Sequence, residues 1–137
     1  VNSTAVKHRV ERFVDARKIH VIPNGMPPPW HAPIEKSAAT SVRREFGIPP
    51  GKPLAVLVAN CNRAVKRVDL LIEAVPLILK QHPAHFMIVG DGHLRSSLEA
   101  RARELGVARD ITFTGQRQDI GGILAEADLS FNTSDSE

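Results

Sequence analysis

The distribution of apolar residues after residue 53 predicts a regular series of strands and helices. Four short runs of residues predict strands, at 54–59, 86–89, 111–114 and 129–132. The first is continuously apolar and bounded by turn residues, which is typical of a strand covered on both faces. Apolar residues at helical spacing lie between these runs and predict helices over 68–79, 94–105 and 120–127. Alternating strands and helices indicate a parallel sheet with crossover helices, so we predict an α/β fold.

Less regular patterns precede this series. Apolar residues recur at helical spacing behind two possible caps, Ser3 and Thr4, and predict a first helix; they are Val6, Val10, Phe13 and Val14. Residues 37–46 predict a short helix that Gly47 ends. Between the two helices, three consecutive prolines before Trp30 forbid regular structure and indicate a linker.

Size and composition indicate one ordinary globular unit. The 137 residues are 42% hydrophobic and 24% charged, which is the usual range for a chain that buries a core. A formal net charge of +3 is too small to indicate nucleic acid, and no basic run is interleaved with aromatic residues. We therefore expect no nucleic-acid partner.

The same composition bears on location and on metal chemistry. The apolar runs are far shorter than the roughly 20 residues of a membrane-spanning helix, and no signal-peptide pattern opens the chain. A cytoplasmic protein is therefore expected. Cys61 is the single cysteine, which excludes an internal disulfide, and the six histidines lack the spacing of metal ligands. We expect no metal site.

Four loops follow the predicted strands, at residues 60–66, 90–92, 115–118 and 133–137. Since the carboxyl ends of parallel strands share one edge of a sheet, we expect these loops to form one crevice. In the first loop and directly after it, Arg63, Lys66 and Arg67 stand at a helix start, where cations oppose the helix dipole and so indicate an anionic ligand. A nucleotide diphosphate is the first ligand to consider.

The second and third loops give weaker signals. The Gly-Asp-Gly run at 90–92 would let the backbone approach a phosphate, but Arg95 stands where the dinucleotide fingerprint G-x-G-x-x-G has its last glycine. That fingerprint is therefore absent. Residues 115–117 are placed to reach either a nucleotide base or only solvent. The motifs of acyl transfer and of protein kinases are absent from the sequence.

Five stretches, in their order and spacing, resemble the family 4 glycosyltransferases: V-I-P-N-G at 21–25, K-R-V-D-L-L-I-E-A at 66–74, F-M-I-V-G-D-G-H-L-R at 86–95, I-T-F-T-G at 111–115 and S-D-S-E at 134–137. The resemblance implies a GT-B enzyme, in which two Rossmann-like domains face a cleft and a sugar is transferred with retention of configuration. It implies that residues 1–18 end the acceptor-side domain, 19–36 form the interdomain crossing and linker, and 37–137 form the first part of the donor-binding domain, cut short.

The resemblance also implies catalytic roles for single residues. Lys66 matches the family lysine that binds the donor diphosphate. Counting back from it, Cys61 falls where the partner arginine is often found, and Arg63 is the nearest substitute. Glu137 matches the first glutamate of the E-x7-E motif, which contacts the transferred sugar or the phosphates. The second glutamate, which would hold the ribose, is expected beyond residue 137.

The walls of the donor site are implied in the same way. Gly90, Asp91 and Gly92 match the glycine loop beside the donor, and Gly115 with Arg117 matches the segment whose backbone commonly meets the base. The donor implied is a nucleotide-diphosphate sugar, linked to UDP or GDP, with no metal and no other cofactor.

The acceptor, a sugar, a lipid or a small molecule, would be bound by the missing domain, so the fragment alone is expected to be inactive. Peripheral association with the inner face of the cell membrane stays open for the full-length protein. Two alternatives also stay open. One is a nucleotide-sugar epimerase of the same architecture, and the other is a nucleotide-binding module without turnover.

Overall fold

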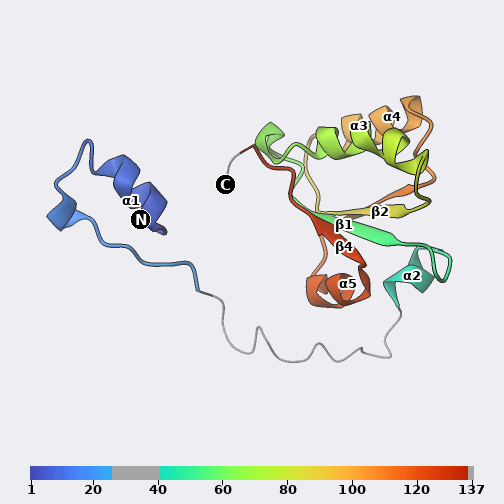
Figure 1. The fold of residues 1–137 in the computed structure, drawn as a ribbon, viewed down its shortest axis with the longest axis horizontal. Helices are drawn as coiled ribbons and strands as arrows, with labels where there is room; N and C mark the ends of the chain where they lie inside the picture. Colours follow the sequence, from blue (N-terminus) through green and yellow to red (C-terminus); the bar gives the residue numbers. More distant parts are fainter. Residues whose placement is uncertain (26–40, 136–137) are drawn as a thin grey trace. The chain divides into compact units, whose positions relative to one another are not determined.

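The computed structural model describes residues 1–25 and 41–135. The chain divides into two compact units, Val1–Pro33 and Ile34–Glu137 (Figure 1). Three parts of the predictions lie outside the described residues: the proline-rich segment with Trp30, the first four residues of the helix expected at 37–46, and Glu137.

The smaller unit contains the predicted first helix, but in a shorter form. Helix α1 spans Thr4–Val10, and the Ser3 hydroxyl accepts a hydrogen bond from the Val6 backbone N–H at 3.2 Å, as its capping position requires. A single 3-10 turn, η1, follows at Ala16–Lys18. The prediction that Phe13 continues the helical stripe was wrong, because the helix ends at Val10 and the Phe13 side chain is 85% exposed.

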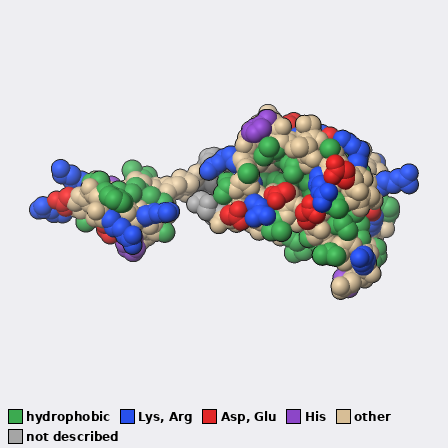
Figure 2. Space-filling model, turned by 90° about the horizontal axis from the view of Figure 1, so that it is seen from above, with side chains coloured by type: hydrophobic (Ala, Val, Ile, Leu, Met, Phe, Trp, Pro, Cys, Tyr) green, Lys and Arg blue, Asp and Glu red, His purple; other side chains and the backbone are tan. Residues whose placement is uncertain are grey.

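The smaller unit also carries the charge imbalance of the chain. Residues 1–25 hold five of the 18 Lys and Arg residues and two of the 15 Asp and Glu residues, so they account for the whole formal charge of +3. Figure 2 shows several of these basic side chains on the visible face of the unit. The larger unit has no excess charge, so a cation in its predicted site must act through its local position.

The larger unit is built on a four-stranded sheet. Its strands are β1 (Leu54–Val58), β2 (His85–Val89), β3 (Ile111–Gly115) and β4 (Leu129–Phe131). All pairings are parallel, and the strand order is β3-β2-β1-β4. The predicted α/β fold with a parallel sheet is therefore confirmed, and all four strands end at the same edge.

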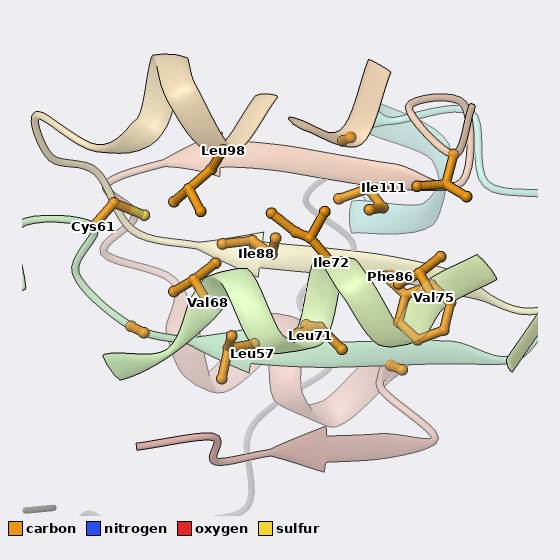
Figure 3. Close-up of a cluster of buried hydrophobic side chains, with 14 of the residues drawn as sticks. Leu57, Cys61, Val68, Leu71, Ile72, Val75, Phe86, Ile88, Leu98 and Ile111 are labelled. Carbon is orange, nitrogen blue, oxygen red and sulfur yellow. The ribbon is translucent and has the colours of Figure 1, made fainter. Parts of the chain in front are cut away.

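Helices cover both faces of this sheet (Figure 1). One face carries α3 (Val68–Leu79) and α4 (Arg95–Glu104), and the other carries α2 (Val42–Glu45) and α5 (Ile120–Glu126). Figure 3 shows the first core, in which side chains of α3 and α4 meet those of β1 and β2.

Alternate residues of the central strands belong to different cores, which explains why residues 54–58 and 86–89 are all apolar. The core under α3 and α4 takes Ala55, Leu57, Phe86 and Ile88. The core under α2 and α5 takes Leu54, Val56, Met87 and Val89. Because successive strand residues point to opposite faces, a strand that is buried on both sides is apolar along most of its length. His85, at the start of β2, is the buried polar exception, and its Nε2 lies 2.8 Å from the Thr112 hydroxyl oxygen.

The short helix α2 depends on a carboxylate from another element. Glu126, the last residue of α5, accepts hydrogen bonds from the Ser41 hydroxyl at 2.7 Å and from the backbone N–H groups of Val42 and Arg43 at 3.2 and 3.3 Å. Burial acts to raise the pKa of Glu126, but these hydrogen bonds outweigh it and hold that pKa below its ordinary value. One side chain therefore satisfies helix N–H groups that have no partner within the helix.

Replacing Glu126 with alanine should therefore lower the free energy of unfolding by about 1 to 2 kcal/mol, the usual cost of a lost helix cap. Urea denaturation at pH 7 measures it. The difference from the wild type should shrink as the pH falls below about 4.5, the ordinary pKa of the group, because the unfolded chain then binds a proton before the folded chain does. It should vanish once the folded carboxylate, with its lowered pKa, is protonated as well.

Glu104→Ala is the matched control for this loss. Glu104 pairs with Arg101 at 3.0 Å, but its side chain is 64% exposed, so its removal should change stability by no more than about 0.5 kcal/mol. An equal effect of the two substitutions would contradict the capping role of Glu126.

Candidate functional site

A cleft of about 500 Å³ lies at the carboxyl edge of the sheet. Its polar lining comes from three of the four predicted loops: Asn60, Asn62 and Lys66 after β1, Gly90 and Asp91 after β2, and Gln116 and Arg117 after β3. Its apolar lining comes from Val58, Val89 and Ile120. The structure thus brings together four of the predicted site residues, namely Lys66, Gly90, Asp91 and Arg117.

The loops after β1 and β2 are joined along their backbones. The Ala59 N–H donates to the Val89 carbonyl at 3.0 Å, the Cys61 N–H to the Asp91 carbonyl at 2.9 Å, and the Leu94 N–H to the Cys61 carbonyl at 3.0 Å. These bonds continue the pairing of the two strands beyond their ends. The wall of the cleft is therefore a fixed part of the fold rather than a separate loop.

This backbone contact explains both glycines of the Gly-Asp-Gly run. Gly90 has φ 144°, and a Cβ atom there would lie 2.8 Å from the Ala59 carbonyl carbon. Gly92 has φ 157°, and a Cβ atom there would lie 2.6 Å from the Asn62 backbone nitrogen. Both positions need glycine because the neighbouring loop passes so close. Gly90 lines the cleft, whereas Gly92 is not among its lining residues.

Lys66 stands where the loops after β1 and β4 meet. It ends a 3-10 turn, η2 (Ala64–Lys66), and its carbonyl accepts a hydrogen bond from the Thr133 hydroxyl at 2.8 Å. It also lines a second hollow of about 370 Å³, with Ser130, Asn132 and Ser134 among the other lining residues. The fourth predicted loop therefore reaches the site through Lys66, and the two hollows share this residue.

Arg63 does not line the cleft. It precedes η2, is exposed, and lines a separate apolar hollow of about 200 Å³ with Leu94 and Leu98. Cys61 lines this hollow too and is only 1% exposed. It belongs to the cluster of buried side chains in Figure 3. Burial, and next the nearby carboxylate of Asp91, raise the pKa of its thiol. The position where the family arginine is often found therefore belongs to the core in this chain.

Arg117 reaches the cleft as part of its framework. Its guanidinium donates to both carboxylate oxygens of Glu45 at 2.6 and 2.9 Å and to those of Asp119 at 2.8 Å, and it lies 5.8 Å from the centre of the Phe46 ring. Hydrogen bonds to Asp119 and then to Glu45 raise the pKa of Arg117 above its ordinary value. Its side chain joins α2 to the loop after β3.

Gly115 and Arg95 brace the same wall. Gly115 ends β3 with φ 74°, and its carbonyl accepts a hydrogen bond from the Gly90 N–H at 2.9 Å. Arg95 donates to the Phe113 carbonyl at 3.1 Å and to the Asp91 carboxylate at 3.3 Å. The residue that replaces the last glycine of a dinucleotide fingerprint therefore links α4 to β3 and to the cleft.

Sequence reasoning named the loops but not all of their functional side chains. Asn60, Asn62 and Gln116 line the cleft, and only their positions inside the predicted loops signalled this. The Asn62 side-chain oxygen accepts from the His93 N–H at 3.0 Å, so this residue also holds the two loops together.

Residues 1–25 and 41–135 contain no helix that combines the length and the apolar composition of a membrane span. Within the same ranges, no group of three or more His, Cys, Asp and Glu side chains is arranged to hold a metal ion.

The chain is similar to glycosyltransferases in sequence and in structure. The family described as glycosyl transferases group 1 matches residues 52–137. The uncharacterized glycosyltransferase MJ1607 of Methanocaldococcus jannaschii is 33% identical over 100 residues, which are 72% of this chain and 25% of that protein.

Two solved structures show the corresponding fold. WaaG, a glycosyltransferase involved in lipopolysaccharide biosynthesis, matches 86% of this chain and 32% of its own with 27% identity and a TM-score of 0.65. HepE of Anabaena, solved in complex with UDP and glucose, matches 99% of this chain and 37% of its own with 23% identity and a TM-score of 0.79. The chain thus spans about a quarter of the length of the sequence relative and about a third of the two structures.

Proposed function

Because this chain belongs to the group 1 glycosyltransferases, we propose that its Ile34–Glu137 unit forms part of the donor site of an enzyme that transfers a sugar from a nucleotide-diphosphate sugar to an acceptor, with retention of configuration. One observation carries the proposal. Lys66, Gly90, Asp91 and Arg117, from three loops far apart in sequence, line a single cleft at the carboxyl edge of a parallel sheet. Ligands of such sheets bind at this edge.

The chemistry of the proposed step assigns the charge of Lys66 a direct role. Breaking the bond between the sugar and the diphosphate leaves a negative charge that grows in the transition state. A cation fixed beside it stabilises that state more than the ground state. The ammonium group of Lys66 would supply this charge, and we propose no metal and no other cofactor for the step. Since Arg63 lines a different hollow, the proposal depends on Lys66 alone in this loop.

The remaining walls suit the rest of the donor. Val58 and Ile120 offer an apolar surface to a flat base, and Gln116 offers an amide for hydrogen bonds. The proposed donor is linked to UDP or GDP; HepE, which shares the fold, was solved with UDP and glucose. Glu137 is proposed to contact the transferred sugar or the phosphates.

In the full-length protein, we propose that the acceptor is a sugar, a lipid or a small molecule, and that the facing domain of a GT-B cleft binds it. We propose that the full-length protein is cytoplasmic, and that it acts at the inner face of the cell membrane if its acceptor is a lipid. Residues 1–137 alone are proposed to bind nucleotide weakly and to catalyse no transfer.

Calorimetric titration of residues 1–137 with the diphosphates of uridine, guanosine and adenosine tests the proposal. Binding of UDP or GDP is expected, and Lys66→Ala should weaken it by roughly tenfold or more, the value of a charge-assisted hydrogen bond to phosphate. Lys80→Ala is the matched control, because Lys80 is an exposed lysine at the other end of α3. It should leave the affinity unchanged.

The other outcomes identify the alternatives. A chain that binds none of the three diphosphates would be a scaffold rather than part of a donor site. Incubation of the full-length protein with a nucleotide sugar and no acceptor distinguishes a transferase from an epimerase. An epimerase would change the configuration of the sugar, whereas a transferase would leave the unchanged sugar attached to its nucleotide.

A further inference from the structure

The residue after Lys66 has an unusual backbone conformation. Arg67 has φ 47° and ψ 42°, and within residues 1–25 and 41–135 no other residue except glycines has a positive φ. Its N–H donates to the Ala64 carbonyl at 2.9 Å and closes η2, and its carbonyl accepts from the Leu70 N–H at 3.1 Å as α3 begins. A side chain in this conformation is retained only where its surroundings stabilise it.

Two ion pairs of the Arg67 side chain stabilise this conformation. Its Nε lies 3.2 Å from the Asp69 carboxylate, in the first turn of α3, and its Nη1 lies 3.1 Å from the Asp135 carboxylate, in the segment after β4. One guanidinium thus joins two carboxylates that are 66 residues apart in the sequence. The side chain of Arg67 is 36% exposed, so the value of these pairs lies in what they position rather than in overall stability.

Two more contacts bring the same segment onto the Lys66 turn. The Thr133 hydroxyl donates to the Lys66 carbonyl at 2.8 Å, and the Asp135 N–H donates to the Val65 carbonyl at 2.9 Å. The segment after β4 is therefore attached to the residues immediately before and after Lys66. Lys66 lines both the 500 Å³ cleft and the 370 Å³ hollow that Ser134 also lines. A shift of this segment that moves Lys66 therefore changes the lining of both.

We infer that Arg67 is a positioning residue: by joining Asp135 to the start of α3 it fixes Lys66 and the segment after β4 in the arrangement that sugar transfer requires. The inference rests on the function proposed above, because it takes the position of Lys66 to serve contact with the donor diphosphate. It extends that proposal to a side chain that is not among the lining residues of either hollow.

Steady-state kinetics of the full-length protein test this role. Arg67→Gly removes the guanidinium but permits the left-handed backbone, so the turn itself can be kept. We expect kcat to fall three- to tenfold while KM for the nucleotide sugar stays within about twofold, because the lost pairs orient Lys66 rather than hold the donor. Asp135→Asn should reproduce the loss. The double variant should be no slower than either single variant, since both remove the same contact.

A matched control separates positioning from general stabilisation. Arg101 also joins two carboxylates, Glu73 at 2.6 Å and Glu104 at 3.0 Å, but it does so between α3 and α4, away from the cleft. Arg101→Ala should leave kcat per folded molecule unchanged. Arg67→Lys keeps the charge without the fork that reaches both carboxylates, so it should restore only part of the rate.

Comparison with Lys66→Ala distinguishes the two ways in which the inference can fail. If Lys66→Ala loses turnover and Arg67→Gly keeps the wild-type kcat, the positioning role is overturned and the proposed function stands. If Lys66→Ala itself keeps wild-type turnover, the proposed function and the role of Arg67 are overturned together. Equal losses of kcat in Arg67→Gly and Arg101→Ala would also overturn the positioning role.

Discussion

Replacing Lys66 with alanine in the full-length protein should lower sugar transfer by roughly 10- to 150-fold. The estimate follows from one charge-assisted hydrogen bond to phosphate, worth about 1.5 to 3 kcal/mol, at about 1.4 kcal/mol for each tenfold change in rate. The loss should fall on kcat more than on KM, because the charge of the departing diphosphate grows in the transition state. Initial rates at saturating and at low donor concentration measure the two separately.

The backbone of the Lys66 turn should be kept by this substitution, because the Thr133 and Asp135 contacts use the carbonyls of Lys66 and Val65. Thermal unfolding of the variant checks that it is folded at the assay temperature, and Lys80→Ala should agree with the wild type in rate. A Lys66→Ala protein with unchanged turnover and unchanged donor affinity would contradict the assignment of this lysine to the diphosphate.

The fold was predictable because its central strands are buried on both faces. A strand such as β1 can be recognised from five consecutive apolar residues, since each face of the sheet meets its own core. Helix ends were predictable where glycine takes a left-handed conformation, as at Gly47 with φ 64° and Gly106 with φ 72°. The first helix was less predictable, because apolar residues such as Phe13 can match a helical period and still lie beyond the helix end.

The candidate site was only partly predictable, because sequence spacing does not give the direction of a side chain. In the structure, the three cationic residues at 63–67 lie in different surroundings. Lys66 lines the cleft, Arg63 lines an apolar hollow, and Arg67 pairs with Asp69 and Asp135. Their number in five residues suggested one strong anion site, whereas only one of them lines the cleft.

Arg117 illustrates the same limit from the other direction. Its place in the loop after β3 was predictable, and it does line the cleft. Glu45 was not predictable as a partner, because it lies 72 residues earlier in the sequence, at the end of α2. A charged residue at a strand end can thus serve the framework of a site as well as its ligand.

The sequence predicted that Gly90 lets the backbone approach a ligand, but the structure shows that the fold itself requires glycine at this position. Gly90→Ala should lower the free energy of unfolding by about 2 to 6 kcal/mol, which combines about 1 to 3 for a strained backbone with about 1 to 3 for overpacking. A Cβ atom would lie 2.8 Å from the Ala59 carbonyl carbon, and the atoms that it meets are backbone, which leaves little room for adjustment. Since most domains have only about 5 to 15 kcal/mol, the variant should be close to unfolding.

Two other glycines separate the causes of this loss. Gly106 has φ 72° with nothing within 4 Å of its Cβ position, so Gly106→Ala adds strain alone and should cost about 1 to 2 kcal/mol. Gly122, in α5, has open space and no positive φ, so Gly122→Ala should stabilise the protein by up to about 1 kcal/mol. Denaturant unfolding of the three variants gives the order. A cost for Gly90→Ala no larger than that for Gly106→Ala would mean that the loops after β1 and β2 are not held together, and the cleft wall would then lose its fixed geometry.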